Sequence, residues 1–236
     1  MQVPSTTDGD YPVTPVPGFA DPVSSWTHLL GAAVVLVAGT LLVARFRGPV
    51  RDRVGLVIFV CGAVFMFSMS GVYHLLSPGS TSRYVLRHLD HAAIWVMIAG
   101  TFTPIHLMLF RGWGRWGVLA LIWSAAITGI VLKTIFFDDF PEWLGLAFYL
   151  GLGWVGCVTG IVLIRRLGVR AARSLIYGGL AYSFGAVFEF LQPPFLIPGV
   201  IGPHEVFHFA VIVGVIYHWG FVKQATLLAL TPTSGA

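Results

Sequence analysis

Residues 54–76 read VGLVIFVCGAVFMFSMSGVYHLL, an apolar run that contains no Asp, Glu, Lys or Arg. A run of this length matches the roughly 20 residues that a helix needs to cross the hydrocarbon core of a bilayer. Lipid offers the backbone N–H and C=O groups no hydrogen-bond partner, so the run must pair them internally as an α-helix. The stretch therefore predicts a transmembrane helix, and its polar residues Ser70 and His74 stand out against apolar surroundings.

The whole chain has the same character. Its 236 residues are 56% hydrophobic and only 10% charged. A soluble domain carries roughly a quarter charged residues, so soluble enzyme folds are excluded. We predict an all-α polytopic membrane protein, a seven-transmembrane-helix bundle, with helices at residues 27–44, 54–76, 90–110, 116–136, 143–164, 171–191 and 204–222.

The bundle is expected to form one domain over residues 27–226. Residues 1–26 hold five prolines and three aspartates, so we expect a disordered N-terminal tail. Residues 227–236 are expected to form a short C-terminal tail. Each of the two cysteines, Cys61 and Cys157, lies inside an apolar run, so neither a disulfide framework nor a cysteine metal site is expected.

The basic residues predict how the chain lies in the membrane, because cytoplasmic loops carry the excess of Lys and Arg. Eleven of them fall on the side of the C-terminus and three on the side of the N-terminus. We therefore expect a multi-pass protein of the cell membrane, with the N-terminus outside and the C-terminus in the cytoplasm. The basic residues are spread thinly between apolar runs, so no nucleic-acid partner is expected.

Several polar residues are predicted to share one depth. His74 ends its helix, Asp90 begins the next one, and His204 and His208 begin the last. In the predicted topology these positions all lie near the outer boundary of the membrane. Polar groups at membrane depth are costly, so the coincidence indicates a functional site.

The histidine spacing favours a metal site. His204 and His208 are four residues apart, which places both imidazoles on one helix face. With His74 they form a three-histidine set that leaves a fourth tetrahedral position open to water, as in catalytic zinc sites. Imidazole ligands suit zinc, so the expected cofactor is Zn2+.

Two more side chains are candidate catalytic residues. Asp90 can take the proton of a water molecule held by the metal, as a general base. Ser70 lies one helical turn before His74, so its hydroxyl can donate a hydrogen bond to a ligand or to a developing oxyanion. The other histidines are expected to be interfacial or packing residues, namely His28, His88, His91, His106 and His218.

The string His204-Glu205-Val206-Phe207-His208 also matches H-E-x-x-H, the helical metalloprotease motif in which the glutamate is the general base. This alternative makes Glu205 essential, whereas the hydrolase hypothesis makes Asp90 essential. The chain offers only His218 downstream as a further ligand, which disfavours a protease.

The chain resembles the hemolysin III family, the bacterial branch of the progestin and adipoQ receptor (PAQR) proteins, also called membrane homeostasis proteins. The resemblance spans the second to seventh predicted helices. It is carried by S-x-x-x-H at residues 70–74, by residues 89–91 through 98–104, and by residues 203–208 followed by Val211 and His218.

This resemblance implies a seven-helix bundle with one zinc ion held by the positions that match His74, His204 and His208. It also matches the family's Asp and Ser positions to Asp90 and Ser70. The wider superfamily is thought to contain metal-dependent membrane hydrolases, with ceramidase as the best-defined activity. The resemblance therefore implies a hydrolase of a lipid amide or ester, with membrane lipids as substrate or ligand.

Two other functions stay open at this stage. A lipid sensor with a structural zinc site would need a fourth protein ligand, for instance Asp90 or Glu189. Glu189 can alternatively be a partner that orients a ligand histidine. A lytic channel is the least favoured function, because no helix carries a continuous line of polar residues. Glycines are frequent in residues 143–164, where we expect close helix packing rather than a groove for an acyl chain. They are Gly145, Gly151, Gly153, Gly156 and Gly160.

Overall fold

The computed structural model describes residues 13–139 and 141–230, and it confirms the predicted fold class. The described chain forms seven α-helices, each long and apolar enough to cross a membrane. The protein is therefore a multi-pass membrane protein. The helices are α1 (Pro22–Arg45), α2 (Val50–Leu75), α3 (Thr81–Leu109), α4 (Trp113–Ile135), α5 (Glu142–Leu167), α6 (Val169–Leu191) and α7 (Pro203–Leu230).

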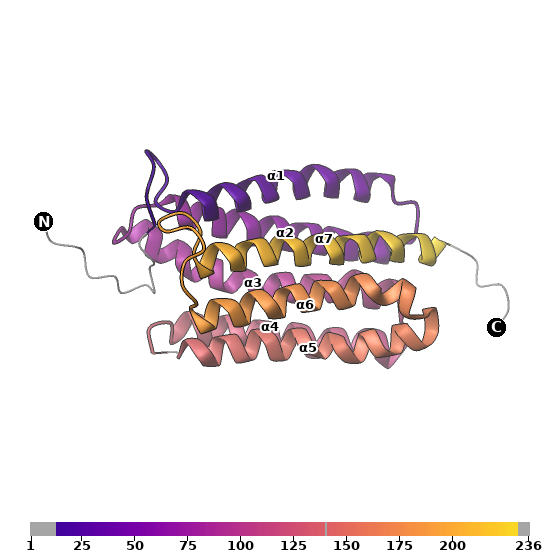
Figure 1. The fold of residues 1–236 in the computed structure, drawn as a ribbon. Helices are drawn as coiled ribbons and strands as arrows, with labels where there is room; N and C mark the ends of the chain where they lie inside the picture. Colours follow the sequence, from indigo (N-terminus) through magenta and orange to yellow (C-terminus); the bar gives the residue numbers. More distant parts are fainter. Residues whose placement is uncertain (1–12, 140, 231–236) are drawn as a thin grey trace, which may run out of the picture.

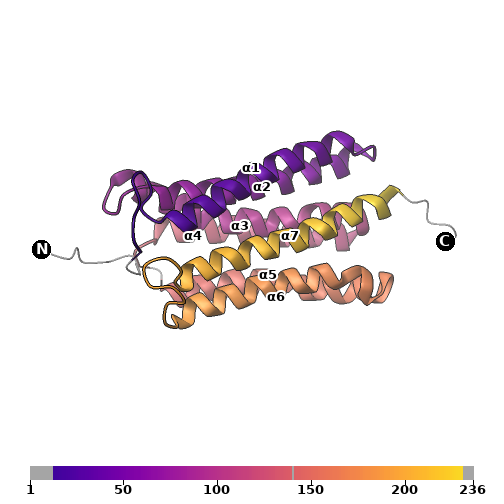
Figure 2. The same cartoon turned by 45° about the horizontal axis from the view of Figure 1, so that its top comes forward.

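The helices run side by side along one long axis, with the connections at the two ends (Figures 1 and 2). The larger buried core joins residues of α1, α2, α3 and α7, with Leu163 from α5. A smaller core joins α3 and α4, with Leu152 from α5. The helix α3 takes part in both cores, so it is the central element of the bundle.

Glycines bring α2 and α3 close together. A Cβ atom added at Gly62 would lie 3.3 Å from the carbonyl oxygen of Val96, and one at Gly100 would lie 3.4 Å from that of Ile58. Small residues at these positions let the two backbones pack directly. This close approach holds the end of α2 that carries His74 next to the first half of α3.

Two helices, α1 and α3, begin five or more residues earlier than predicted. The helix α3 begins at Thr81 rather than at residue 90, because Ser80 caps it by accepting a hydrogen bond from the Arg83 backbone N–H. The basic residues in its first turns lower the local hydropathy and hide this start from the sequence pattern. Asp90 therefore lies inside α3, not in its first turn.

The helix α1 begins at Pro22, inside the expected tail of residues 1–26. Proline suits the first turn of a helix, where no N–H is needed. Residues 13–21 are part of the described structure, whereas residues 1–12 lie outside it. At the other end of the chain, α7 continues to Leu230, and residues 231–236 lie outside the described part.

The prediction of close packing along α5 is wrong for three of its glycines. A Cβ atom added at Gly151, Gly153 or Gly160 would meet nothing within 4 Å, and one at Gly156 would meet only Phe102, at 3.5 Å. The helix lies at the edge of the bundle, beside α6 (Figure 1). The exposed glycines Gly151 and Gly153 leave open space on the α5 surface.

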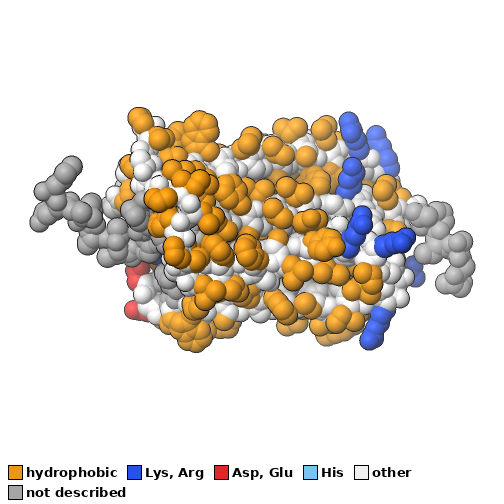
Figure 3. Space-filling view, viewed as in Figure 1, with side chains coloured by type: hydrophobic (Ala, Val, Ile, Leu, Met, Phe, Trp, Pro, Cys, Tyr) orange, Lys and Arg blue, Asp and Glu red, His pale blue; other side chains and the backbone are white. Residues whose placement is uncertain are grey.

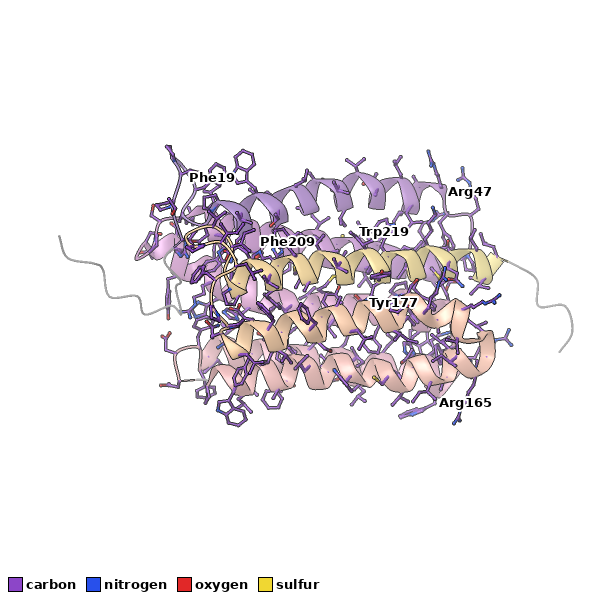
Figure 4. The ribbon with its side chains drawn as sticks, in the orientation of Figure 1. Phe19, Arg47, Arg165, Tyr177, Phe209 and Trp219 are labelled. Atoms are coloured by element: carbon purple, nitrogen blue, oxygen red, sulfur yellow. The ribbon has the colours of Figure 1, made fainter. Side chains whose placement is uncertain are left out.

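Basic side chains gather at the end of the bundle at which α7 ends (Figure 3). Arg47, between α1 and α2, and Arg165, in the last turn of α5, both project at this end (Figure 4). The middle of the same face is covered by hydrophobic side chains. The predicted orientation, with the C-terminus in the cytoplasm, rests on this uneven distribution of basic residues.

Candidate metal centre

Three histidines from two helices meet near the end of the bundle at which α7 begins. His74 lies in the last turn of α2, and His204 and His208 lie in the first two turns of α7. Their candidate ligand atoms all lie within 4.8 Å of one another, and the Nε2 atoms of His74 and His204 are 3.0 Å apart. The structure thus brings together the three side chains predicted as ligands, in a group that could hold one metal ion.

The outer ring nitrogens of two of these histidines face carboxylates. Nδ1 of His74 lies 2.8 Å from Oδ2 of Asp21, and Nδ1 of His204 lies 3.0 Å from Oε1 of Glu189. An ionised carboxylate only accepts hydrogen bonds, so both Nδ1 atoms carry a proton and donate it. Both Nε2 atoms are then directed to each other. Glu189 therefore lies where a partner of a ligand histidine is expected.

His208 is held by packing. It is 2% exposed, and its ring stacks on that of His28 with centroids 3.8 Å apart and planes 14° apart. His28 was expected to be an interfacial or packing residue. It does pack, but its partner is a candidate ligand, and its Nδ1 lies 2.8 Å from Oγ of Ser70.

The remaining histidines lie outside the group. The rings of His88 and His91 both pack against Phe137, and their centroids lie 3.8 and 5.2 Å, respectively, from the centroid of the Phe137 ring. His106 lies near the other end of α3, where its Nδ1 donates to a backbone carbonyl oxygen at 2.7 Å. His218 packs against a tyrosine ring of α6. Each of these residues has the packing environment that the sequence predicts for it.

Asp90 and Ser70 lie beside the group rather than in it. Asp90 is half-buried in α3, where it interacts electrostatically with His204 and its carboxylate interacts with the Ser70 side chain. Ser70 also contacts His28, whose Nδ1 lies 2.8 Å from its hydroxyl oxygen, so His28 of α1 holds the Ser70 side chain beside the group. Among the described residues, the group that could share a metal ion consists of the three histidines and no carboxylate.

Glu205 has a structural environment. Its Oε1 accepts a hydrogen bond from the Ser24 hydroxyl at 2.9 Å, and its Oε2 accepts one from the Gly202 backbone N–H at 2.9 Å. The second bond is half of a capping box, in which a glutamate at the third helical position reaches back to the start of its helix. Both oxygens are occupied in buried contacts, which argues against the H-E-x-x-H protease alternative.

One face of α1 contributes to the site although the prediction from sequence does not include it. Asp21, Ser24, Ser25 and His28 have the spacing i, i+3, i+4, i+7 of a single helix face. This face packs against α2 and α7. Asp21 contacts His74 and His28 contacts Ser70, while the Ser24 hydroxyl donates to Glu205 and the Ser25 hydroxyl donates to the carbonyl oxygen of Gly71 at 2.7 Å. The periodic signal was present in the sequence. It was overlooked because residues 1–26 were assigned to a tail.

Arg83 of α3 fixes the charge of Asp21. Its Nη2 donates to Oδ2 of Asp21 at 2.8 Å, and Arg83 is itself buried. Burial alone would raise the pKa of the Asp21 carboxyl, but the hydrogen bond from His74 and the positive charge of Arg83 hold this pKa below its usual value. Asp21 is therefore ionised at neutral pH.

Fold and site together define a seven-helix integral membrane protein with a three-histidine group near one end of its bundle. A family model described as "Haemolysin-III related" matches residues 19–219. The chain belongs to this haemolysin-III-related family, as the resemblance in its motifs predicts.

Three relatives place the chain within this family. It is 30% identical to hemolysin-3 of Bacillus cereus over 190 residues, which cover 80% of this chain and 83% of the relative. It is 32% identical to the hemolysin-3 homolog of Bacillus subtilis over 164 residues, or 69% of this chain and 76% of the relative. A more distant relative is the heptahelical transmembrane protein ADIPOR2 of Oryza sativa subsp. japonica, 29% identical over 177 residues, or 69% of this chain and 77% of the relative.

Proposed function

We propose that this protein is a zinc-dependent hydrolase that cleaves an amide or ester bond of a membrane lipid. One observation carries the proposal. In the described part of the chain, the residues that could share an ion are three histidines without a carboxylate. Three protein ligands with one open position are typical of catalytic zinc, whereas structural zinc has four protein ligands.

The donor set fits a metal ion. With carboxylates on their Nδ1 sides, His74 and His204 turn their Nε2 atoms to each other at 3.0 Å, the distance of a hydrogen bond between the two rings. A metal ion that takes the place of the shared proton would be held by both nitrogens. Tetrahedral zinc, with bonds of about 2.0–2.1 Å to nitrogen, separates its ligand nitrogens by about 3.3 Å, close to this distance.

When bound, a zinc ion supplies a Lewis acid that polarises a carbonyl group and lowers the pKa of a water molecule to about 7. The protein residues supply the rest of the chemistry. Asp90 accepts the proton of the attacking water at its carboxylate as the water oxygen adds to the carbonyl carbon. Asp90 then returns this proton to the leaving nitrogen or oxygen as the amide or ester bond breaks.

Ser70 and His28 position the general base in this proposal. The Ser70 hydroxyl is engaged by both His28 and Asp90. This engagement favours a role in orienting Asp90 over the predicted donation to a ligand or oxyanion. Asp21 and Glu189 orient two of the ligand histidines.

The location of the site supports a lipid substrate. The histidines lie in terminal turns of helices long and apolar enough to cross a membrane. Terminal turns of such helices are expected near the polar boundary of the bilayer, where the carbonyl groups of lipids lie. In the predicted orientation this is the outer side of the cell membrane. Hydrolysis of membrane lipids there would serve membrane homeostasis.

The test combines metal analysis with lipid turnover. Wild type is expected to hold one zinc ion per chain and to hydrolyse a component of lipid extracted from its host. Asp90→Asn should keep the zinc and lose at least about 100-fold in turnover, the scale of general-base catalysis. His208→Ala should lose both, while the matched control His88→Ala should keep both. A zinc-loaded wild type without turnover on any host lipid would favour the lipid-sensor alternative and overturn the proposal.

A further inference from the structure

We propose that Asp21, which precedes α1, is a positioning residue of the metal centre. It fixes the tautomer and orientation of His74, and so sets the affinity of the centre for its metal ion. This inference rests on the proposed metal binding by the three histidines. With this role for Asp21, the N-terminal segment of residues 13–21 becomes part of the site.

Asp21 holds His74 by two hydrogen bonds. Its side-chain Oδ2 accepts from Nδ1 of His74 at 2.8 Å, and its backbone N–H donates to the carbonyl oxygen of His74 at 2.9 Å. The neighbouring N–H of Ala20 donates to the carbonyl oxygen of Leu75 at 3.2 Å. These backbone bonds satisfy carbonyl groups that the last turn of α2 leaves without a helical partner. Residues 20–21 are therefore fixed to the end of α2 independently of the side-chain contact.

Arg83 immobilises the carboxylate of Asp21. Its guanidinium donates to Oδ2 of Asp21 at 2.8 Å and to the carbonyl oxygen of Leu76 at 2.6 Å, and it lies 4.7 Å from the centroid of the Tyr73 ring. Oδ2 thus accepts from both Arg83 and His74. A buried cation needs a counter-ion, so Arg83 keeps the carboxylate both in place and ionised.

The consequence for His74 is a single productive state. A neutral imidazole has two tautomers, and a carboxylate at Nδ1 selects the one whose Nε2 lone pair is free to bind a metal. The negative charge also makes the ring a stronger donor. Glu189 acts in the same way on His204, but it comes from α6, whereas Asp21 ties the start of the described chain to the centre.

The experiment measures the zinc affinity of the full-length protein in detergent, by competition with a chromophoric chelator. Asp21→Asn keeps the shape of the side chain and removes its charge, and it should weaken zinc binding by about 10- to 100-fold, the usual effect of losing such a partner. Asp21→Glu restores the charge and should bind zinc more tightly than Asp21→Asn. The matched control is Asp138→Asn, whose carboxylate lies at the same end of the bundle and accepts a hydrogen bond from Tyr84. It should leave the affinity unchanged.

A second readout separates positioning from simple structural support. Cobalt substituted for zinc reports its ligand field in its visible spectrum, and this spectrum should shift in Asp21→Asn. An affinity within twofold of wild type with an unchanged cobalt spectrum would overturn the inference. If Asp21→Asn does not fold, Asp21→Glu alone decides, because moving the carboxylate by one methylene should shift the spectrum, and a wild-type spectrum and affinity would refute the role. A wild type that binds no metal would instead refute the proposed function.

Discussion

Replacing Glu205 separates the two chemistries that the helix-seven motif allows. In the structure this carboxylate ties α7 to α1 and caps α7, through hydrogen bonds to Ser24 and Gly202 of 2.9 Å each. Glu205 is 2% exposed and Ser24 is fully buried. The account therefore predicts an effect on stability, whereas a protease mechanism predicts an effect on turnover.

The size of the effect follows from the hydrogen bonds. In Glu205→Gln the amide oxygen can accept from the Gly202 N–H while its NH2 group donates to the Ser24 hydroxyl, which turns to accept. Both bonds survive and only the charge assistance is lost, so the free energy of unfolding should fall by about 1 kcal/mol. Glu205→Ala leaves a buried hydroxyl and a buried N–H without a partner, at about 1–3 kcal/mol each, so its loss should be about 2–6 kcal/mol.

The assay measures unfolding and turnover per bound zinc on the same detergent samples. Glu205→Gln should keep its zinc and stay within a few-fold of wild-type turnover, and Glu205→Ala should be the less stable of the two variants. Asp90→Asn provides the opposite pattern, with normal stability and lost turnover. A loss of 100-fold or more in Glu205→Gln at unchanged stability would show that Glu205 is the general base, and it would refute the reasoning.

Three further predictions concern packing, metal and orientation. Gly62→Leu should destabilise the protein by about 1–3 kcal/mol, because even its Cβ would lie 3.3 Å from the Val96 carbonyl oxygen, whereas Gly151→Ala, which meets open space, should be neutral or stabilising in thermal unfolding. Removing zinc with a chelator should lower the unfolding temperature of wild type, because zinc at a hundredfold excess over its Kd adds about 2.7 kcal/mol to the free energy of unfolding. The same treatment should leave the unfolding temperature of His208→Ala unchanged. A fluorescent reporter that matures only in the cytoplasm should be active when it is fused to the C-terminus. An inactive C-terminal fusion together with an active N-terminal fusion would contradict the predicted orientation.

The fold could be predicted because hydropathy alone requires it. Apolar runs such as residues 54–76 leave no alternative to helices in lipid. The convergence of His74 with His204 and His208 followed from their shared depth. Depth says where a residue lies along a helix, but it does not say which helices are neighbours or which way a side chain faces.

The parts that the sequence did not reveal depend on such lateral contacts. Asp21 lies in a proline-rich stretch whose hydropathy resembles a tail, and only its contact with His74 shows its place in the site. The role of Glu205 depends on the backbone N–H of Gly202, just before α7, and on Ser24 of a distant helix. Gly151, Gly153 and Gly160 have no neighbour within 4 Å of a Cβ position because α5 lies at the edge of the bundle, and composition cannot show that.

The central claim is that His74, His204 and His208 hold one zinc ion whose fourth ligand is water. It is tested most directly by diffraction from crystals of zinc-replete protein, with an anomalous difference map recorded at the zinc absorption edge. The account predicts a single peak among the three imidazoles, with a water molecule completing the coordination and Asp90 beside that water. A map without a peak there, or a peak with Asp90 or Glu189 as the fourth ligand, would contradict it.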